Sequence, residues 1–327
     1  MNQPLQVNYK VTIGTTTYTV DDSSLVLNLR VSSSLNIPVN LCQISLILAD
    51  SLAPSLDQSI TVKLGSNSQL SQVFQGKVSQ IKWQVDQVNI EAMSSFSSLT
   101  KAKFNLLYEK SFAGDIVKNI AQNILGLKVK QVDNGIKFPV YVIGNQHTVY
   151  ENLQILAQKC GFDLYANIED QLVFAPYKTS KKHKFEYGIN LLAWEQMEEN
   201  PLQSGVEVYG ESPASQGQGE KAVSWLTKKE VKGTDGKKSP ATLQLEDSTA
   251  RTQDIANKIA KAYLKKYQKK QKGVIKVVGE PEAKLGDSIE IAKMPISSLN
   301  GTFKITGVEH YLSRHKGFYT TIHWEEV

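Results

Sequence analysis

The chain has 327 residues, of which 41% are hydrophobic, and its 37 basic and 32 acidic residues leave a formal net charge of +5. This composition excludes a generally disordered chain, and so modest a charge does not by itself indicate a nucleic-acid partner. No apolar stretch approaches membrane-spanning length, and the first residues lack a basic segment followed by an apolar run, so we expect a soluble protein made in the cytoplasm. The two cysteines, Cys42 and Cys160, lie among apolar neighbours without metal-type spacing, which indicates buried reduced thiols.

The first hundred residues carry almost only β-strand signals. Short runs with alternating apolar residues are separated by turns of Gly, Ser, Asn, Asp and Pro, which favours an antiparallel barrel or sandwich over alternating βαβ units. We assign residues 1–103 to a first β-domain. The predicted strands cover residues 9–13, 17–20, 24–31, 40–48, 59–64, 72–81 and 87–93.

Helical patterns follow in residues 104–180, which we assign to an α/β insert. Apolar residues at helical spacing over 112–124 predict a short amphipathic helix, for which Ser111 is the expected N-cap. A second helix is better marked, because Thr148 and Glu151 form a capping box before an apolar stripe. It leads directly into a predicted hairpin.

The remaining residues, 181–327, are assigned to a second β-domain. After two strand signals, the segment 210–241 is rich in Gly, Ser, Pro, Gln and Lys, so we expect exposed loops there. A long amphipathic helix over 248–272 is predicted next, with one apolar stripe. A terminal antiparallel sheet then has strands predicted at 274–278, 287–291, 302–310 and 317–324.

The terminal sheet contains a faint copy of the first domain. The hexapeptide DQSITV near the start of the chain resembles DSIEI near its end. Phe74 follows Ser59 by fifteen residues, and the corresponding pair, Ser288 and Phe303, has the same spacing. The same offset of 229 residues brings a strand of the terminal sheet within one residue of an apolar run in the first domain. We expect one β-module used twice, with two unrelated antiparallel sheets as the alternative.

Histidines near the C-terminus are the first candidates for a metal site. His310 and His323 would face each other across the last hairpin, with Glu309, His315 and Glu325 near them in sequence, and such a group could bind zinc. Successive residues of a strand point to opposite faces, so Glu309 and His310 do not easily serve one ion. We favour ordinary sheet or interface histidines and predict no metal site.

Three carboxylates are the candidates for cleavage of a glycoside or of peptidoglycan, which needs one carboxyl group kept protonated by an apolar setting. Glu195, Glu198 and Glu199 form the densest acidic group, but they precede Asn200 and Pro201 in a polar segment, which favours a solvated loop. The sequence holds no nucleophile elbow, phosphate-binding loop or dinucleotide-binding turn. We therefore predict no catalytic residues, no cofactor and no enzyme activity.

Lysines crowd the predicted helix over 248–272 and could contact phosphates. On the outer face and carboxyl end of a helix, however, lysines are usually solvated and favour the helix dipole. We favour contact with an acidic protein surface over nucleic-acid binding. The lysines concerned are Lys258, Lys261, Lys265, Lys266, Lys269 and Lys270.

Three local patterns resemble the baseplate hub proteins of contractile tails. The family includes the phage late control D proteins and the amino-terminal part of the spike proteins of type VI secretion. Each pattern is weak alone, and together they extend over nearly the whole chain. They are GNQHT at 144–148 leading through the second helix to an aromatic strand, GDIVKNIA at 114–121, and the chain end with GEP at 279–281, LGD at 285–287, GTFKI at 301–305, VEH at 308–310 and YTT at 319–321.

The resemblance implies an α+β fold in which two similar antiparallel, tube-like β-barrels flank the α/β insert, with a long helix before the terminal sheet. It implies a homotrimer whose six barrels match the hexameric inner tube protein, with baseplate wedge components as further partners. The spike would be a separate protein, because this chain ends where many relatives continue into a further barrel and a needle.

By the same resemblance, cargo or DNA would pass through the lumen without tight binding, and this chain would not insert into a membrane. The chain would assemble in the bacterial cytoplasm into a phage tail or a phage-derived injection particle, and its lysine helix would contact tube or spike. Two alternatives stay open on the sequence alone: a tail-associated peptidoglycan hydrolase and a basic β-barrel nucleic-acid-binding protein.

Overall fold

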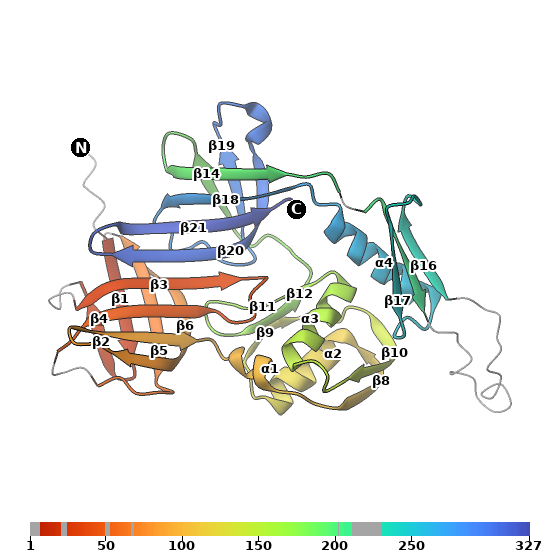
Figure 1. Ribbon diagram of the computed structural model, residues 1–327, viewed down its shortest axis with the longest axis horizontal. Helices are drawn as coiled ribbons and strands as arrows, with labels where there is room; N and C mark the ends of the chain where they lie inside the picture. The colour runs from red at the N-terminus through yellow and green to blue at the C-terminus, as the bar shows by residue number, and fades with distance from the viewer. Residues whose placement is uncertain (1–6, 21–24, 50–52, 67–68, 202, 211–230) are drawn as a thin grey trace.

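The computed structural model describes residues 7–20, 25–49, 53–66, 69–201, 203–210 and 231–327. Strands dominate it, and most of them join one 13-stranded sheet that contains the first and the last described strands (Figure 1). One two-stranded and two three-stranded sheets hold the others. All these sheets are open, and no closed barrel is found among the described residues. Within the same residues, no helix has both the length and the apolar character needed to cross a membrane.

The first hundred residues form one half of the large sheet, as their alternating pattern predicts. Strands β3, β4, β7, β6, β5 and β1 lie side by side in this order, with β2 at the edge. In β4 and β7 buried and half-buried residues alternate, because one face of each strand packs on a core that includes Leu29, Ile44 and Phe74. The strands are β1 (Val7–Ile13), β2 (Thr16–Thr19), β3 (Val26–Ser34), β4 (Leu41–Ile47), β5 (Ser59–Ser66), β6 (Gln69–Trp83) and β7 (Gln87–Met93).

The last part of the chain forms the other half. Strands β14, β18, β21 and β20 are neighbours in this order, β19 pairs with β20, and β13 pairs with β19. Their core includes Ile275, Phe303 and Trp324, and the two aromatic ring centroids lie 4.0 Å apart. The predicted terminal strands are confirmed. The strands are β13 (Lys182–Glu186), β14 (Leu191–Glu198), β18 (Gln271–Val278), β19 (Ser288–Ala292), β20 (Gly301–Ser313) and β21 (Gly317–Glu325).

The two halves of the sheet repeat one pairing scheme. Strands β3, β4, β7, β6 and β5, here named the first unit, pair antiparallel in the same order as β14, β18, β21, β20 and β19, the second unit. Two of the three bulges of the first unit recur in the second, and the third, at Val73 where β6 pairs with β5, does not. β6 and β20 have a bulge at Ser79 and Thr306, and β3 and β14 have one at Leu27 and Leu192. Because bulges are specific features of a strand, their recurrence argues for one architecture used twice.

Strand pairing corrects the residue alignment proposed from the sequence. Counted back from the equivalent bulges, Lys77 corresponds to Lys304, and Phe303 therefore corresponds to Gly76 and not to Phe74. The constant offset was wrong by two residues here, since the chain from Ser59 to its partner Lys77 is two residues longer than the chain from Ser288 to its partner Lys304.

The segment between the two units forms the predicted helices and the predicted hairpin, together with three strands, β8, β9 and β10, that the sequence did not indicate. The capping box is confirmed: the Thr148 amide donates to Glu151 at 2.7 Å, and the Glu151 amide donates to the Thr148 hydroxyl at 3.3 Å. The expected N-cap Ser111 was wrong, because it lies in a strand and the helix begins after Phe112. The elements are α1 (Ser97–Lys101), β8 (Leu106–Phe112), α2 (Ala113–Lys118), the π-helix η1 (Asn119–Ile124), β9 (Val129–Val132), β10 (Lys137–Ile143), α3 (Val149–Cys160), β11 (Asp163–Ala166) and β12 (Leu172–Ala175).

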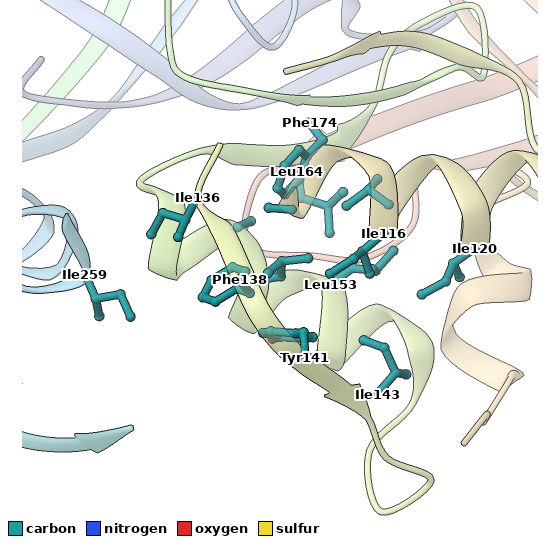
Figure 2. Packing of buried hydrophobic residues seen from close by; sticks show 14 of the residues in the cluster. Ile116, Ile120, Ile136, Phe138, Tyr141, Ile143, Leu153, Leu164, Phe174 and Ile259 are labelled. Atoms are coloured by element: carbon teal, nitrogen blue, oxygen red, sulfur yellow. The ribbon is translucent and has the colours of Figure 1, made fainter. Parts of the chain in front are cut away.

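A small sheet and the long helix pack on this segment rather than on the terminal sheet. The sheet consists of β15 (Gly205–Gly210), β16 (Lys232–Gly236) and β17 (Thr242–Asp247), and α4 (Gln253–Tyr267) lies against it. Ile259 of α4 belongs to the same cluster as Phe138, Ile116 and Leu153, part of which is shown in Figure 2.

Two predictions about this region need correction. The segment 210–241 is not loop throughout, because β16 pairs with β15; residues 211–230 lie outside the described part. The helix begins at the N-cap Thr252, whose hydroxyl accepts the Ile255 amide, and it ends at Tyr267, so it is shorter than 248–272.

Candidate assembly interface

The two units are joined edge to edge within the chain. Strand β3 of the first unit pairs antiparallel with β20 of the second, from Ser34 opposite Gly307 to Asn28 opposite Ser313. In Figure 1 the red β3 lies directly beside the blue β20. The same β20 also pairs with β21 over this stretch, so it is an interior strand of the joined sheet. This β3–β20 contact, here named the internal junction, makes one sheet of two units.

Side chains on one face of the internal junction form an ion pair with aromatic neighbours. Arg30 of β3 reaches Glu309 of β20 at 2.6 Å between Nη2 and Oε2. This hydrogen bond is the main reason that the pKa of Arg30 is raised. Beside the pair, the rings of Tyr311 and Tyr319 lie 5.0 Å apart, and the Lys276 ammonium lies 3.6 Å from the Tyr319 ring centroid.

The other face of the internal junction is apolar. Leu312 of β20 is only 7% exposed, because it packs into the hydrophobic core of the first unit together with Phe318. It lies opposite Leu29 of β3, which is fully buried. The second unit therefore contributes a side chain to the core of the first, which stabilises the contact through burial of apolar surface.

The hairpin of β11 and β12 braces both units. On the first unit, Asn40 donates to the Ala166 carbonyl at 3.0 Å and Gln72 donates to the Ile168 carbonyl at 2.9 Å. On the second unit, the Lys304 ammonium, nearly buried, contacts Asp163 at 2.6 Å. One hairpin therefore holds the two units in a fixed relation.

The histidine candidates are not brought together. His310 is buried and bonds Thr320 at 3.0 Å, and burial lowers its pKa to about 4, so it is neutral at pH 7. His323 and His315 are exposed, while Glu309 and Glu325 pair with cations. Among the described residues, no cluster of three or more His, Cys, Asp or Glu side chains could hold a metal ion.

Two of the three carboxylate candidates lie on a strand instead of a loop, so for these two the sequence interpretation was wrong. Glu195 and Glu198 are in β14, Glu199 follows it, and all three are exposed. Glu199 contacts Lys272 at 3.2 Å. Their exposure to solvent contrasts with the apolar setting that cleavage of a glycoside requires around one of its carboxyl groups.

The lysine candidates divide between α4 and the chain after it. Lys258, Lys261, Lys265 and Lys266 lie on the exposed side of α4, as predicted. Lys269 lies beyond the helix and is mostly buried next to Glu325, and burial lowers its pKa. The lysines therefore do not form one continuous basic face.

The cysteine prediction holds in part. Cys42 is buried, Cys160 is half-buried, and both are free thiols. Burial raises the pKa of both, to about 11 for Cys160, so neither is a thiolate at neutral pH.

Sequence reasoning missed the internal junction and its ion pair. Arg30 and Glu309 are 279 residues apart, and each looks like an ordinary exposed residue of an alternating strand. The only local signal is their opposite charge, which acquires meaning once the two strands are known to pair.

No protein-family model matches the chain, and no curated protein matches it. Three solved structures that share its fold have sequence identities of 15% or less. The 43 kDa tail protein of prophage MuSo2 from Shewanella oneidensis has a TM-score of 0.72 at 15% identity, over 98% of both chains. The Escherichia coli c3393 protein, a type VI secretion component described as similar to the bacteriophage T4 tail proteins gp27 and gp5, has a TM-score of 0.61 at 12% identity, over 97% of this chain and 77% of that one.

A chain of the half-lidded PdpA–VgrG complex of Francisella has a TM-score of 0.59 at 11% identity, over 99% of this chain and 59% of that one. Identities this low carry information about the fold alone. The mostly β architecture with its open sheets is thus the fold seen in a phage tail protein and in a type VI secretion component.

Proposed function

We propose that this protein is a structural, non-enzymatic hub of a contractile phage tail or of a tail-like injection system. In this role it forms a homotrimer that carries the hexameric inner tube on one side and a separate spike protein on the other, with baseplate wedge components around it. The likeness in fold to a phage tail protein and to a type VI secretion component supports the setting.

The observation that carries the proposal is the repeat of one strand-pairing scheme in a single polypeptide. A tube of six identical subunits presents six equal contacts, whereas a trimer of single-unit chains presents three. Three chains with two like units each present six contact surfaces. A trimeric ring of such chains therefore stacks on a hexameric ring with one unit against each tube subunit. The internal junction and the β11–β12 hairpin support this by fixing the two units relative to each other.

In this proposal the units are tube-like barrels whose open sheets close against neighbouring chains, and the lumen passes cargo or DNA. The proposed domains are 1–103, 104–180 and 181–327. The particle would assemble in the bacterial cytoplasm, and the exposed lysines of α4 would face acidic surfaces of tube or spike.

The proposal is tested by locating the chain in purified particles. An epitope-tagged chain is expressed in the bacterium that encodes it, and particles are imaged after immunogold labelling and quantified by mass spectrometry. Three copies at the point where tube meets spike are expected. Label along the sheath or tube shaft, or absence from every tail-like particle, would overturn the hub role.

A further inference from the structure

One strand edge of each unit is left without a partner in the single chain. In the second unit, β14 pairs with β18 on one side and ends the large sheet on the other. In the first unit, β5 covers β6 only as far as Lys77, and no described strand pairs with Gln80–Trp83 on that side. Exposed strand edges are sites at which another strand can add.

These two edges are the counterparts of the two strands that meet in the internal junction. From the bulges, β14 is equivalent to β3, and the last residues of β6 are equivalent to the stretch of β20 that pairs with β3. The chain therefore holds one joined pair of edges and one unjoined pair of the same kind. The two unjoined edges do not meet in one molecule, because six strands, β18, β21, β20, β3, β4 and β7, lie between β14 and β6 in the sheet.

We infer that β14 of one protomer pairs antiparallel with β6 of a second copy, in the register of the internal junction. This inference rests on the proposed ring and names the contact that closes it. Transferring the register places Lys82 opposite Met197 and Trp83 opposite Gln196. The contact, here named the external junction, would alternate with the internal junction around the ring.

Charges support this pairing, because the ion pair of the internal junction recurs with its signs exchanged. Arg30 corresponds to Glu195, and Glu309 corresponds to Lys82. In the transferred register Lys82 lies diagonal to Glu195, as Glu309 lies diagonal to Arg30. Both side chains are exposed, and neither forms an ion pair with any described residue.

The exchange of signs also selects the partner. If the first units of two chains met, Arg30 would face Lys82, and if two second units met, Glu195 would face Glu309. Like charges across a strand pair are unfavourable. Only alternation of first and second units brings opposite charges together at every contact, which is the order that a ring of two-unit chains requires.

Exposed apolar side chains mark the same two edges. On the β6 side, Trp83 is 53% exposed and Val85 in the following turn is 97% exposed. On β14, Leu192 and Met197 are 57% and 45% exposed. Counted along the chain from the equivalent bulges, Val85 corresponds to Leu312, which lies in a strand and is buried in the neighbouring core, whereas β6 ends at Trp83. An equivalent burial of Val85 against β14 would remove this apolar surface from water.

Buried polar atoms on β14 point the same way. Gln196 Oε1 and Trp194 Nε1 are shielded from solvent without a hydrogen-bond partner among the described residues. Buried polar groups in folded proteins normally form hydrogen bonds. A strand added at the β14 edge would supply the hydrogen-bond partners that these two atoms lack.

Charge reversal in the full-length chain tests the inference. Lys82→Glu and Glu195→Lys should each raise the chain concentration needed for half-maximal trimer formation by roughly tenfold, and the double variant should recover most of that loss. The readout is mass by light scattering after gel filtration across a concentration series. Matched controls are Lys10→Glu and Glu169→Lys, which reverse exposed charges away from both edges.

Covalent capture gives an independent readout. A chain carrying both Lys82→Cys and Met197→Cys should form disulfide-linked dimers and trimers on mild oxidation, with trimers as the end of the ladder. In an antiparallel strand pair, the distance between opposite side chains depends on whether the two residues exchange backbone hydrogen bonds. The neighbouring pair, Ile81→Cys with Glu198→Cys, belongs to the other of these two kinds and is tested in parallel. Chains with one introduced cysteine, or with only Cys42 and Cys160, should give no linked trimer.

The outcomes separate the two proposals. Trimers that are insensitive to both charge reversals and give no linked species with either cysteine pair would overturn the external junction and leave the trimeric hub standing. A chain that stays monomeric at every soluble concentration would overturn both. Linked chains longer than three would contradict ring closure.

Discussion

The two units of the large sheet share their pairing scheme and differ in how they fill their cores. Where the second unit has Trp324 on β21, the first has Ala92 on the equivalent β7, and where the second has Gly273 on β18, the first has Cys42. A Cβ atom on Gly273 would lie 2.5 Å from the Trp324 ring. The large side chain of one strand is thus matched by the missing side chain of its neighbour.

This difference shows that the two units share their strand pairing and not the side chains that fill their cores. The order of strand pairing and two of the bulges are common to both units, whereas core volume is distributed differently among the same positions. Phe303, for example, stacks on Trp324, while its equivalent Gly76 leaves room for Phe74. A repeat that is clear in strand topology is therefore faint in the sequence.

The largest expected effect comes from replacing Trp324 of the second unit by alanine, the residue that the first unit has at the equivalent position, Ala92. Trp324→Ala should lower the free energy of unfolding by about 3–5 kcal/mol, because it leaves a cavity beside Phe303 and Gly273. Urea unfolding followed by circular dichroism measures it. The exposed Trp83→Ala should stay within about 0.5 kcal/mol at a concentration where the chain is monomeric. Equal losses from both would contradict the assigned packing.

The second-largest difference in unfolding free energy is expected between two lysines at equivalent positions of the two units. Lys304 is nearly buried against Asp163, whereas Lys77 is exposed. Lys304→Ala should cost about 3 kcal/mol, since it leaves a carboxylate at the hairpin without its partner, and Lys77→Ala should cost about 0.5 kcal/mol or less. The same unfolding assay compares them. A small effect of Lys304→Ala would show that the hairpin does not brace the second unit.

Acid should weaken the second unit through His310, whose equivalent in the first unit is the exposed Trp83. Burial holds the pKa of His310 at about 4, below its unfolded value of about 6.5, so its contribution is fully present above pH 6.5 and is lost as the pH falls toward 4. At pH 4.5 the loss should be about 2.5 kcal/mol relative to pH 7.5. Unfolding of His310→Gln should depend less on pH over this window, and an unchanged slope would refute the assignment.

The ion pair of the internal junction should have the smallest effect. Arg30 and Glu309 are both partly exposed, so a double-mutant cycle with Arg30→Ala and Glu309→Ala should give a coupling of about 0.2–1 kcal/mol. Exchanging the two residues as Arg30→Glu with Glu309→Arg should recover most of the stability of the parent chain. A coupling of zero would show that backbone pairing and the apolar face with Leu312 hold the internal junction together without help from the ion pair.

Local features of the fold could be predicted from the sequence, and non-local ones could not. Alternating residues in β4 or β21 predict strands because the pattern lies within the strand, and the capping box of Thr148 and Glu151 predicts the start of α3 because both partners lie in one turn. The pairing of β3 with β20 joins residues almost the whole chain apart, and no local pattern encodes its register.

The errors have similar causes. Glu195 was placed in a loop because its polar neighbourhood resembles one, whereas β14 is an edge strand and edge strands carry charges. Phe74 and Phe303 were equated because spacing along the chain was taken for spacing in the sheet. The candidate interface follows from pairing registers, which a single sequence does not contain.

The most direct test of the two-unit account is electron cryomicroscopy of the purified full-length ring at a concentration where light scattering shows the trimer. The account predicts three chains around the axis and six like units, with the first and second units related by a rotation of about 60° and β14 of each chain beside β6 of the next. A ring with another number of chains, or units that no sixfold rotation relates, would contradict it.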